Sequence, residues 1–484
     1  MKFKVLLGMF FFSYFIGISN ASTFPDRRSC ELLSSEFLKS DKNGKFHTDT
    51  FLVSKAGKIV FEWYDPFHTP ETRHCLWSAS KTVTSLIAGA TIQKERMKLD
   101  DQIESYVAYE ARKQVFPKHS PEDHKIFSEL TIRHLINMNS ALNWSEDYGK
   151  DIRNSSVLHM LYGPGYKDMS EFVLSLGFDR RGPGNTWRYS TGDTMLLSRA
   201  LSVVNKDDPQ YPWTILFSPL GIADAVFERD RQGIFLGGSS VFMSTRDMLK
   251  LGQLMLANGV WNGVQILPPD WMQFMRSISP GELNGEFSDE FIETNGVYGG
   301  GVWLNQSIRG LKPIMPHASN TVFFAAGHFG QYILMFPDKD MVVVRTGHDT
   351  DYWGTLDLLT NWVENCFGEE SDAPIPLSSL VPVPDFTLPI SESLYAMRSG
   401  LMASMVAKEF CSCRFITGLP LSECRERSHL PKSALRLLDI DDSKSLQLNV
   451  GPSVLGHVSV IAVSPSASAF LDPRHPEEGC RLYK

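Results

Sequence analysis

The chain has 484 residues, of which 43% are hydrophobic, and it carries a formal net charge of −8 at pH 7. This length can bury one extended hydrophobic core and still leaves room for a second, smaller domain. The acidic balance, with a sequence pI near 5.9, argues against a nucleic-acid-binding surface.

The N-terminus has the pattern of a signal peptide. Lys2 and Lys4 precede an apolar segment that ends at Ile18, and small residues follow up to Ala21. We therefore expect residues 1–21 to be removed and the mature protein to be periplasmic or secreted. The apolar segment is short for a bilayer, so no stable membrane span is expected after cleavage. An uncleaved anchor is the alternative.

The first motif with a chemical meaning is a serine followed three residues later by a lysine. Ser78 and Lys81 lie just ahead of an apolar-periodic stretch, from Val83 to Ala90, that predicts a buried helix. Both side chains should share one face of its first turn, where a lysine kept neutral by burial can accept the serine proton. The alternative is a chance pairing, so the motif needs support from other segments.

A second motif contains Tyr189, which precedes another apolar run that predicts a helix. Ser190 or Thr191 is the expected N-cap of this helix. A phenol at this entry can share a proton with Lys81 and pass it to a leaving group. The alternative is a tyrosine that only packs over the start of a helix.

A glycine-flanked segment leads into a β-forming stretch further along the chain. Gly327, His328 and Gly330 precede Gln331, and residues 331–336 are predicted to form an edge strand. Such a strand can direct a backbone N–H at a substrate carbonyl oxygen, with Gly330 leaving space for a close approach. The alternatives are a hairpin with a bulge for the two glycines and a buried polar residue for the histidine.

Together, the three motifs resemble those of the serine β-lactamase and penicillin-binding-protein-like superfamily, which combines an S-x-x-K helix, a tyrosine motif and a K-T-G-type strand. The similarity is to its class C β-lactamase-related branch of esterases, D-aminopeptidases and 6-aminohexanoate-dimer hydrolases. It extends to an opening hairpin at 51–62, a helix-initiating segment at 130–135, a glycine loop at 237–240 and the next helix start at 244–247. It covers roughly residues 30–368.

The resemblance implies an α/β (α+β) fold of the β-lactamase/transpeptidase type over residues 22–368. The expected core is an antiparallel sheet flanked by helices, with a helical subdomain inserted between the two halves of the sheet domain. A proline-rich linker is expected at 369–389. Residues 390–484 are then predicted to form a small, disulfide-stapled, Cys-rich C-terminal α+β appendage. Its predicted elements are a helix at 394–406 and strands at 446–450 and 458–463.

The resemblance also implies the roles of the site residues. Ser78 would be the acylated nucleophile, Lys81 its proton acceptor and Tyr189 a partner in the proton relay. Backbone N–H groups of Ser78 and Gln331 would form the oxyanion hole, in which losing one donor typically costs ~2.7–4 kcal/mol of transition-state stabilisation. Neither a metal nor an organic cofactor is expected for this chemistry.

Two departures from the family pattern bear on the substrate. Thr191 stands where the tyrosine motif of the β-lactamases has asparagine, and His328 stands where the antibiotic hydrolases carry lysine. His328, Gly330 and Thr191 are the expected substrate-binding positions, and histidine is mostly neutral at pH 7. Hydrolysis of an uncharged or weakly charged amide or ester is therefore favoured over hydrolysis of penicillins. The competing hypothesis is a penicillin-recognising sensor or a catalytically silent binding protein of the same fold.

Export favours disulfides among the seven cysteines, and the odd count leaves at least one thiol over. Cys30 and Cys366 lie near the ends of the hydrolase-like region, which commonly meet in this fold, so the resemblance implies a bridge between them. Cys75 is expected to be free. Two more bridges, in a pairing that the sequence leaves open, are expected among Cys411, Cys413, Cys424 and Cys480. A zinc site built from the first three of these is the weaker alternative.

Overall fold

The structure is a computed structural model, and part of the chain is described in it. The described residues are 46–107, 120–148, 154–284, 296–308, 313–349, 352–367, 404–405, 407–420, 423–424, 446–449, 458–462, 467–471 and 475–483. The predicted signal peptide, the predicted linker and most of the helix expected at 394–406 lie outside them. The domain boundaries drawn from the sequence therefore stay predictions.

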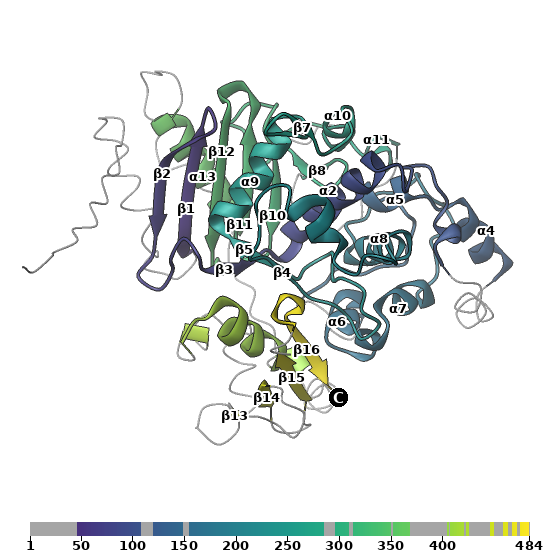
Figure 1. Ribbon diagram of the computed structural model, residues 1–484. Coiled ribbons are helices and arrows are strands. Elements are labelled where there is room, and N and C mark those ends of the chain that lie inside the picture. The colour runs from purple at the N-terminus through teal and green to yellow at the C-terminus, as the bar shows by residue number, and fades with distance from the viewer. Residues whose placement is uncertain are drawn as a thin grey trace, which may run out of the picture.

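A seven-stranded antiparallel sheet lies on the left of the molecule in Figure 1, beside a region built of helices. Its strand order is β2-β1-β12-β11-β10-β9-β8. The strands are β1 (Thr48–Lys55), β2 (Lys58–Tyr64), β8 (Val297–Tyr298), β9 (Trp303–Leu304), β10 (Phe323–Gly327), β11 (Gln331–Phe336) and β12 (Met341–Gly347). β1 and β2 form the hairpin predicted at 51–62, and β1 pairs with the distant β12. The sheet is therefore complete only when the two ends of the hydrolase-like region meet.

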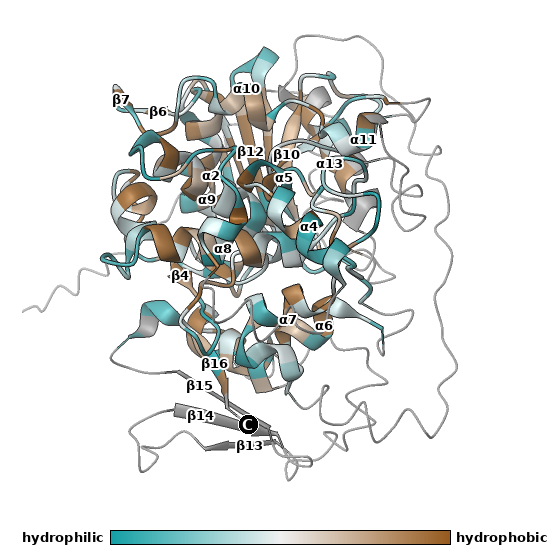
Figure 2. Cartoon of the chain, turned by 90° about the vertical axis from the view of Figure 1, so that its right-hand side faces the viewer, coloured by the Kyte–Doolittle hydropathy of each residue, from teal (hydrophilic) through white to brown (hydrophobic). Residues whose placement is uncertain are grey.

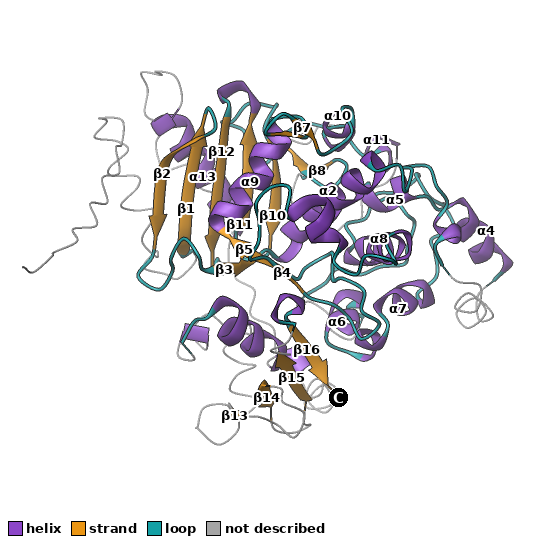
Figure 3. Cartoon of the chain, in the orientation of Figure 1, coloured by secondary structure: helices purple, strands orange, loops and turns teal. Residues whose placement is uncertain are grey.

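Helices cover the sheet and build a second region beside it (Figure 3). The helices are α2 (Ser80–Gln93), α4 (Pro121–Glu129), α5 (Ile132–Ile136), α6 (Ser156–Leu161), α7 (Met169–Ser175), α8 (Thr191–Val204), α9 (Thr245–Leu256), α10 (Trp271–Met275), α11 (Pro280–Asn284) and α13 (Tyr352–Phe367). Helices α4 to α8 lie between the two halves of the sheet in the chain, which confirms the predicted helical insertion. Within the described part of the chain, no helix combines the length and apolar character needed to cross a membrane.

Side chains alternate between the two faces of the sheet, as the period of a strand requires. On β12, Val342 belongs to the apolar cluster that contains α9, and Val343 belongs to the cluster that contains α13. Helix α9 can approach the sheet closely because Gly252 has no side chain. A Cβ at this position would lie 2.4 Å from Cγ1 of Val342. On the other face, the rings of Phe51 and Trp362 are 4.6 Å apart. In Figure 2, α9 carries both hydrophobic and hydrophilic residues, since one side of the helix packs on the sheet.

The prediction that residues 331–336 form an edge strand is wrong. β11 lies between β12 and β10, because β10, β9 and β8 continue the sheet beyond it. A tight hairpin joins β10 to β11, with Gly327 paired to Gln331 across its end. A hairpin, offered as the alternative for the two glycines, is therefore what the structure contains.

Three smaller sheets complete the described structure. Their strands are β3 (Arg73–Cys75), β4 (Val226–Phe227) and β5 (Val241–Ser244) in one sheet, β6 (Val260–Trp261) and β7 (Val264–Gln265) in the second, and β13 (Leu446–Asn449), β14 (Val458–Ala462), β15 (Ala467–Leu471) and β16 (Cys480–Tyr483) in the third. The two strands predicted in the C-terminal region correspond to β13 and β14. β15 and β16 were not predicted.

The described cysteines settle the pairing that the sequence left open. The C-terminal bridges are Cys411–Cys480 and Cys413–Cys424, and Cys75 is a free thiol, as predicted. Cys366 is also disulfide-bonded, while its expected partner Cys30 lies outside the described residues. The alternative zinc site is wrong, because each of its three cysteines is held in a disulfide.

Candidate active site

The serine and the lysine lie where β3 turns into helix α2. A short 3₁₀ turn, η1 (Trp77–Ala79), connects β3 to α2. The helix begins at Ser80, in the region where the sequence predicted a helix. Trp77, directly before Ser78, has φ of 46°, in the left-handed region that bulky residues rarely adopt. Strained residues of this kind are held in place by surrounding contacts and cluster at functional sites. One such contact joins the N–H of Leu76 to the carbonyl oxygen of Val241, at 2.9 Å.

Lys81 contacts Ser78 directly. Its Nζ lies 3.0 Å from Oγ of Ser78, 2.8 Å from Oγ1 of Thr191 and 2.9 Å from the carbonyl oxygen of Gly238. A neutral lysine has two N–H groups, which can donate to the hydroxyl of Thr191 and to the carbonyl oxygen of Gly238. It also has one lone pair, which can accept the proton of Ser78. The geometry therefore suits a lysine that takes a proton from the serine.

The electrostatic surroundings of Lys81 favour its neutral form. The side chain is 1% exposed, and burial lowers the pKa of Lys81 to about 8. The carboxylate of Glu146 acts in the opposite direction, with its Oε1 3.8 Å from Nζ, but its effect on the pKa is the smaller of the two. Neutral lysine is thus accessible at neutral to mildly alkaline pH.

Glu146 is a buried carboxylate that the sequence did not reveal. It accepts hydrogen bonds from the N–H of Thr191 at 2.9 Å, from Oγ1 of Thr191, from Nε1 of Trp144 and from the hydroxyl of Tyr148 at 3.2 Å. A single acidic residue in a non-periodic loop reads as a surface residue, and only the fold brings it to Lys81. We find no local sequence signal that would have identified it.

Thr191 lies in the same network. It is the first residue of α8, whose N-cap is Ser190, one of the two predicted candidates. Its side chain is fully buried and its hydroxyl sits between Lys81 and Glu146. A Cβ at Gly238 would lie 2.5 Å from Cγ2 of Thr191, so the glycine lets its loop reach this network. The structure thus places Thr191 beside Lys81, and its expected role in substrate binding stays a prediction.

Tyr189 reaches Lys81 through the face of its ring. The Nζ of Lys81 lies 4.8 Å from the ring centroid, a cation–π arrangement. The ring stacks on Trp303 at 5.3 Å and also packs against Trp187 and Tyr298. These three aromatic residues are buried with Tyr189 in one apolar cluster, so they form part of the core.

The β10–β11 hairpin packs against the turn that carries Ser78. A Cβ at Gly327 would lie 2.0 Å from the carbonyl oxygen of Leu76, two residues before the serine. Gln331 pairs with Gly327, so its backbone starts β11 beside this turn. The side-chain amide of Gln331 donates to the carbonyl oxygen of Gly347 at 2.7 Å, which fixes the residue. The hairpin therefore brings the two predicted oxyanion-hole residues into one neighbourhood.

A buried ion pair supports the loop at residues 328–330. The fully buried Arg345 pairs with Asp349, with Nη2 and Oδ1 2.7 Å apart, and its Nη1 donates to the carbonyl oxygen of Gly330 at 2.9 Å. The N–H of Asp349 donates to the carbonyl oxygen of Phe329 at 3.0 Å. Gly330 has φ of +85°, and a Cβ there would lie 2.1 Å from Nη1 of Arg345. Glycine is therefore required here both by the left-handed backbone and by the space that the ion pair occupies.

His328 sits in the loop among aromatic rings. Its ring centroid is 5.2 Å from that of Tyr148 and 6.3 Å from that of Trp77. Burial, together with the nearby His348, lowers the pKa of His328 to about 4. The imidazole is therefore neutral at pH 7, in agreement with the expectation that this position offers no permanent cation.

A serine and a buried lysine at a helix start, next to a hairpin of an antiparallel sheet covered by helices, define the class of β-lactamase-fold hydrolases. The chain belongs to the Beta-lactamase family, whose match covers residues 35–351. The family membership and the fold inferred from the three motifs are thereby confirmed.

Individual proteins with which the chain shares similarity are hydrolases of this fold. It is 24% identical over 331 residues to the 6-aminohexanoate-dimer hydrolase of Paenarthrobacter ureafaciens, covering 64% of this chain and 76% of that protein. A putative β-lactamase from Bacteroides dorei DSM 17855 superposes with a TM-score of 0.55 at 16% identity, over 72% of this chain and 100% of the other. EstCE1, described as a hydrolase with promiscuous acyltransferase activity, superposes with a TM-score of 0.53 at 16% identity, over 70% of this chain and 100% of the other. At such identities the structural likeness shows the fold.

Proposed function

We propose that this protein is an exported serine hydrolase that cleaves a small amide or ester through an acyl-enzyme on Ser78. The observation that carries the proposal is the 3.0 Å contact between Oγ of Ser78 and Nζ of Lys81, a lysine whose pKa burial lowers to about 8. A serine becomes a competent nucleophile when a neighbouring base can accept its proton. Membership of a hydrolase family supports the same conclusion.

The proposed reaction begins when Oγ of Ser78 attacks the substrate carbonyl carbon and Lys81 accepts its proton. Backbone N–H groups of Ser78 and Gln331 stabilise the oxyanion of the tetrahedral intermediate. The leaving amine or alcohol then departs with a proton supplied through Lys81 and Tyr189. Water attacks the acyl-enzyme in the second half of the cycle and releases the acid.

The surroundings of the serine favour an uncharged substrate. His328 is neutral at pH 7 because burial lowers its pKa, so it cannot serve as a permanent cation for the carboxylate of a penicillin. Apolar ring surface near His328 is supplied by Trp77, Phe329 and Tyr148. We therefore place the activity with short-chain esters and short linear amides. The similarity to a 6-aminohexanoate-dimer hydrolase and to EstCE1 supports this choice.

The test is incubation of the purified protein with chromogenic short-chain esters, anilides and nitrocefin. A fluorophosphonate probe followed by mass spectrometry locates the reactive serine. We expect ester or amide turnover, a probe adduct on Ser78, and loss of both in Ser78→Ala. Ser128→Ala, on α4, where the hydroxyl only bonds to the carbonyl oxygen of Lys125, is the matched control and should behave like the wild type. A penicillin adduct that persists without turnover would instead support the sensor hypothesis, and a folded protein that shows neither result would refute acyl transfer.

Export is tested separately. Cell fractionation followed by N-terminal sequencing should find the protein outside the cytoplasm, beginning at Ser22. A protein that retains Lys2 and Lys4 in the cytoplasmic fraction would contradict this part of the proposal.

A further inference from the structure

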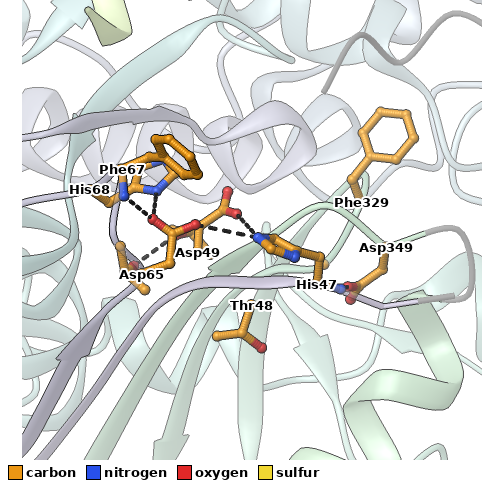
Figure 4. A network of polar contacts seen from close by, with 12 residues as sticks. His47, Thr48, Asp49, Asp65, Phe67, His68, Phe329 and Asp349 are labelled. Atoms are coloured by element: carbon orange, nitrogen blue, oxygen red, sulfur yellow. Dashed lines mark hydrogen bonds and ion pairs between the residues drawn. The ribbon is translucent and has the colours of Figure 1, made fainter. Parts of the chain in front are cut away.

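A cluster of histidine and aspartate side chains lies on β1, β3 and the loop after β2, and none of its members belongs to the candidate active site. Asp49 belongs to β1, Asp65 directly follows β2, His68 lies in the next loop and His74 belongs to β3. These four residues are only 5–7% exposed. Figure 4 shows the two carboxylates between the rings of His47 and His68. Burial of carboxylates and imidazoles together is costly unless they are paired or bind a metal ion.

Three of these residues are placed as a set of metal ligands. Asp49, His68 and His74 each offer one ligand atom, and these atoms lie within 4.8 Å of one another. Zn²⁺ is held at ~2.0–2.2 Å by nitrogen and oxygen ligands, which places tetrahedral ligand atoms roughly 3.4 Å apart. Rotations that move the ligand atoms by about 1 Å would close the site. The rings of His68 and His74 already stack, with centroids 4.8 Å apart.

A supporting carboxylate orients one of the ligands. Nδ1 of His68 bonds to Oδ1 of Asp65 at 2.6 Å, which leaves Nε2 of His68 as the ligand atom. Asp65 is itself fixed, because Oδ1 accepts from the N–H of Phe67 at 2.8 Å and its own N–H donates to the carbonyl oxygen of Asp49 at 2.9 Å. A carboxylate bonded to the far nitrogen of a histidine is the usual support of a metal-binding histidine.

The nearby charged residue on β3 does not take the place of a cation here. Arg73 directs its guanidinium to the carboxylate and carbonyl oxygen of Asp224 and to the carbonyl oxygen of Ile416. Asp49, His68 and His74 line part of a cavity of about 130 Å³ that extends to Trp77 and Gln331. It leaves room for a water molecule as a fourth ligand.

We propose that Asp49, His68 and His74 bind one divalent transition-metal ion, with zinc as the metal that two imidazoles and one carboxylate suit best. A second possible set, His47 with Asp49 and Asp65, has one imidazole and two carboxylates, and its His47 side chain is 35% exposed. Asp65 is also the partner of His68, so we assign it to the supporting role.

The proposed ion would join β1, the loop after β2 and β3. His74 lies four residues before Ser78 on the strand that leads into the η1 turn. An ion at this position would restrain the segment that carries the serine without contacting it. Metal binding is therefore separable from hydrolysis, and its measurement does not depend on the proposed activity.

The test uses the full-length, untagged protein, stripped of metal with a chelator and then titrated with Zn²⁺ by calorimetry. We expect one saturable site per chain and a rise in the melting temperature when Zn²⁺ is restored. His68→Gln and His74→Gln should each weaken binding at least tenfold, and Asp65→Asn by about 10- to 100-fold. His124→Gln, on the exposed surface of α4, is the control and should bind like the wild type.

Cobalt(II) spectroscopy checks the ligand set. Co²⁺ should give visible bands of a tetrahedral nitrogen and oxygen site, with no thiolate charge-transfer band from the neighbouring Cys75. Absence of stoichiometric binding by the wild-type protein would overturn the proposal, and this readout requires no variant to fold. Loss of binding in His47→Gln with full binding in His74→Gln would also overturn it, as would a thiolate band that disappears in Cys75→Ser.

Discussion

Replacement of Glu146 by glutamine should move the pH dependence of the reaction. The carboxylate favours the ammonium form of Lys81, so its neutralisation should lower the pKa of the lysine below the present value of about 8. Because the neutral lysine is the proposed base, the acid limb of kcat/KM should move to lower pH. The direction follows from the sign of one charge.

The magnitude follows from the geometry. Two unit charges 3.8 Å apart interact with about 4 kcal/mol at an effective dielectric constant near 20 and about 1 kcal/mol in bulk water. Division by 1.36 kcal/mol per pKa unit gives a shift of roughly 1 to 3 units. Both side chains are almost fully buried, so we expect the result in the upper half of this range.

Glutamine is a suitable replacement at this position. The Oε2 of Glu146 accepts from two N–H groups, those of Trp144 and the Thr191 backbone, and an amide oxygen can accept both. The Oε1 faces the hydroxyls of Thr191 and Tyr148, which can turn to accept from an amide NH₂. The hydrogen bonds can therefore be kept while the charge is removed.

The assay is a profile of kcat/KM against pH, from about pH 5 to 10, for the wild type and Glu146→Gln. Glu122→Gln, an exposed acid on α4, is the matched control and should leave the limb in place. An acid limb that stays where it is, or that moves to higher pH, would refute the assignment of Lys81 as the base that Glu146 controls. A parallel loss of rate at every pH with an unchanged limb would assign Glu146 to packing alone.

Three further substitutions test other parts of the site. Ser78→Ala should abolish turnover and change the free energy of unfolding by less than ~0.5 kcal/mol in a urea titration, since it removes one hydroxyl; residual turnover would contradict the nucleophile assignment. Gly327→Ala adds a Cβ 2.0 Å from the carbonyl oxygen of Leu76, so it should displace the hairpin and lower kcat/KM about 10²-fold in a protein that circular dichroism shows to be folded. A normal rate would show that the oxyanion hole does not depend on this contact. Arg345→Met should cost about 3–5 kcal/mol of stability in the same titration, because it leaves the Asp349 carboxylate buried without its partner. A cost below ~1 kcal/mol would contradict the conclusion that this ion pair supports the loop at residues 328–330.

The parts of the site that the sequence predicted are those encoded by local spacing. Ser78 and Lys81 are three residues apart, so the η1 turn and the start of α2 bring them together locally. The N-cap role of Ser190 is equally local, because the serine accepts a hydrogen bond from the N–H of Asp193 three residues on. β13 and β14 also followed from short apolar patterns.

The parts that could not be predicted depend on contacts between distant segments. Glu146 is 65 residues from Lys81, and nothing near it in the sequence marks it as buried. The position of β11 in the sheet was wrong for a related reason. A strand buried on both faces and a strand at an edge can share the same apolar residues, and the difference is set by whether other strands, here β10 to β8, pair beyond it.

The described C-terminal segment is bonded to the small sheet whose strand β3 leads into the Ser78 turn. The buried carboxylate of Glu228, directly after β4, accepts from Nζ of Lys408, from Oγ of Ser412 at 3.0 Å and from the N–H of Cys480 at 3.0 Å. The disulfide between Cys411 and Cys480 joins the two segments that supply these donors. β4 pairs with β5, and β5 pairs with β3, which leads into the Ser78 turn. Since a buried carboxylate without donors is costly, this region is better understood as part of the support for the site than as an appendage that could be removed without consequence.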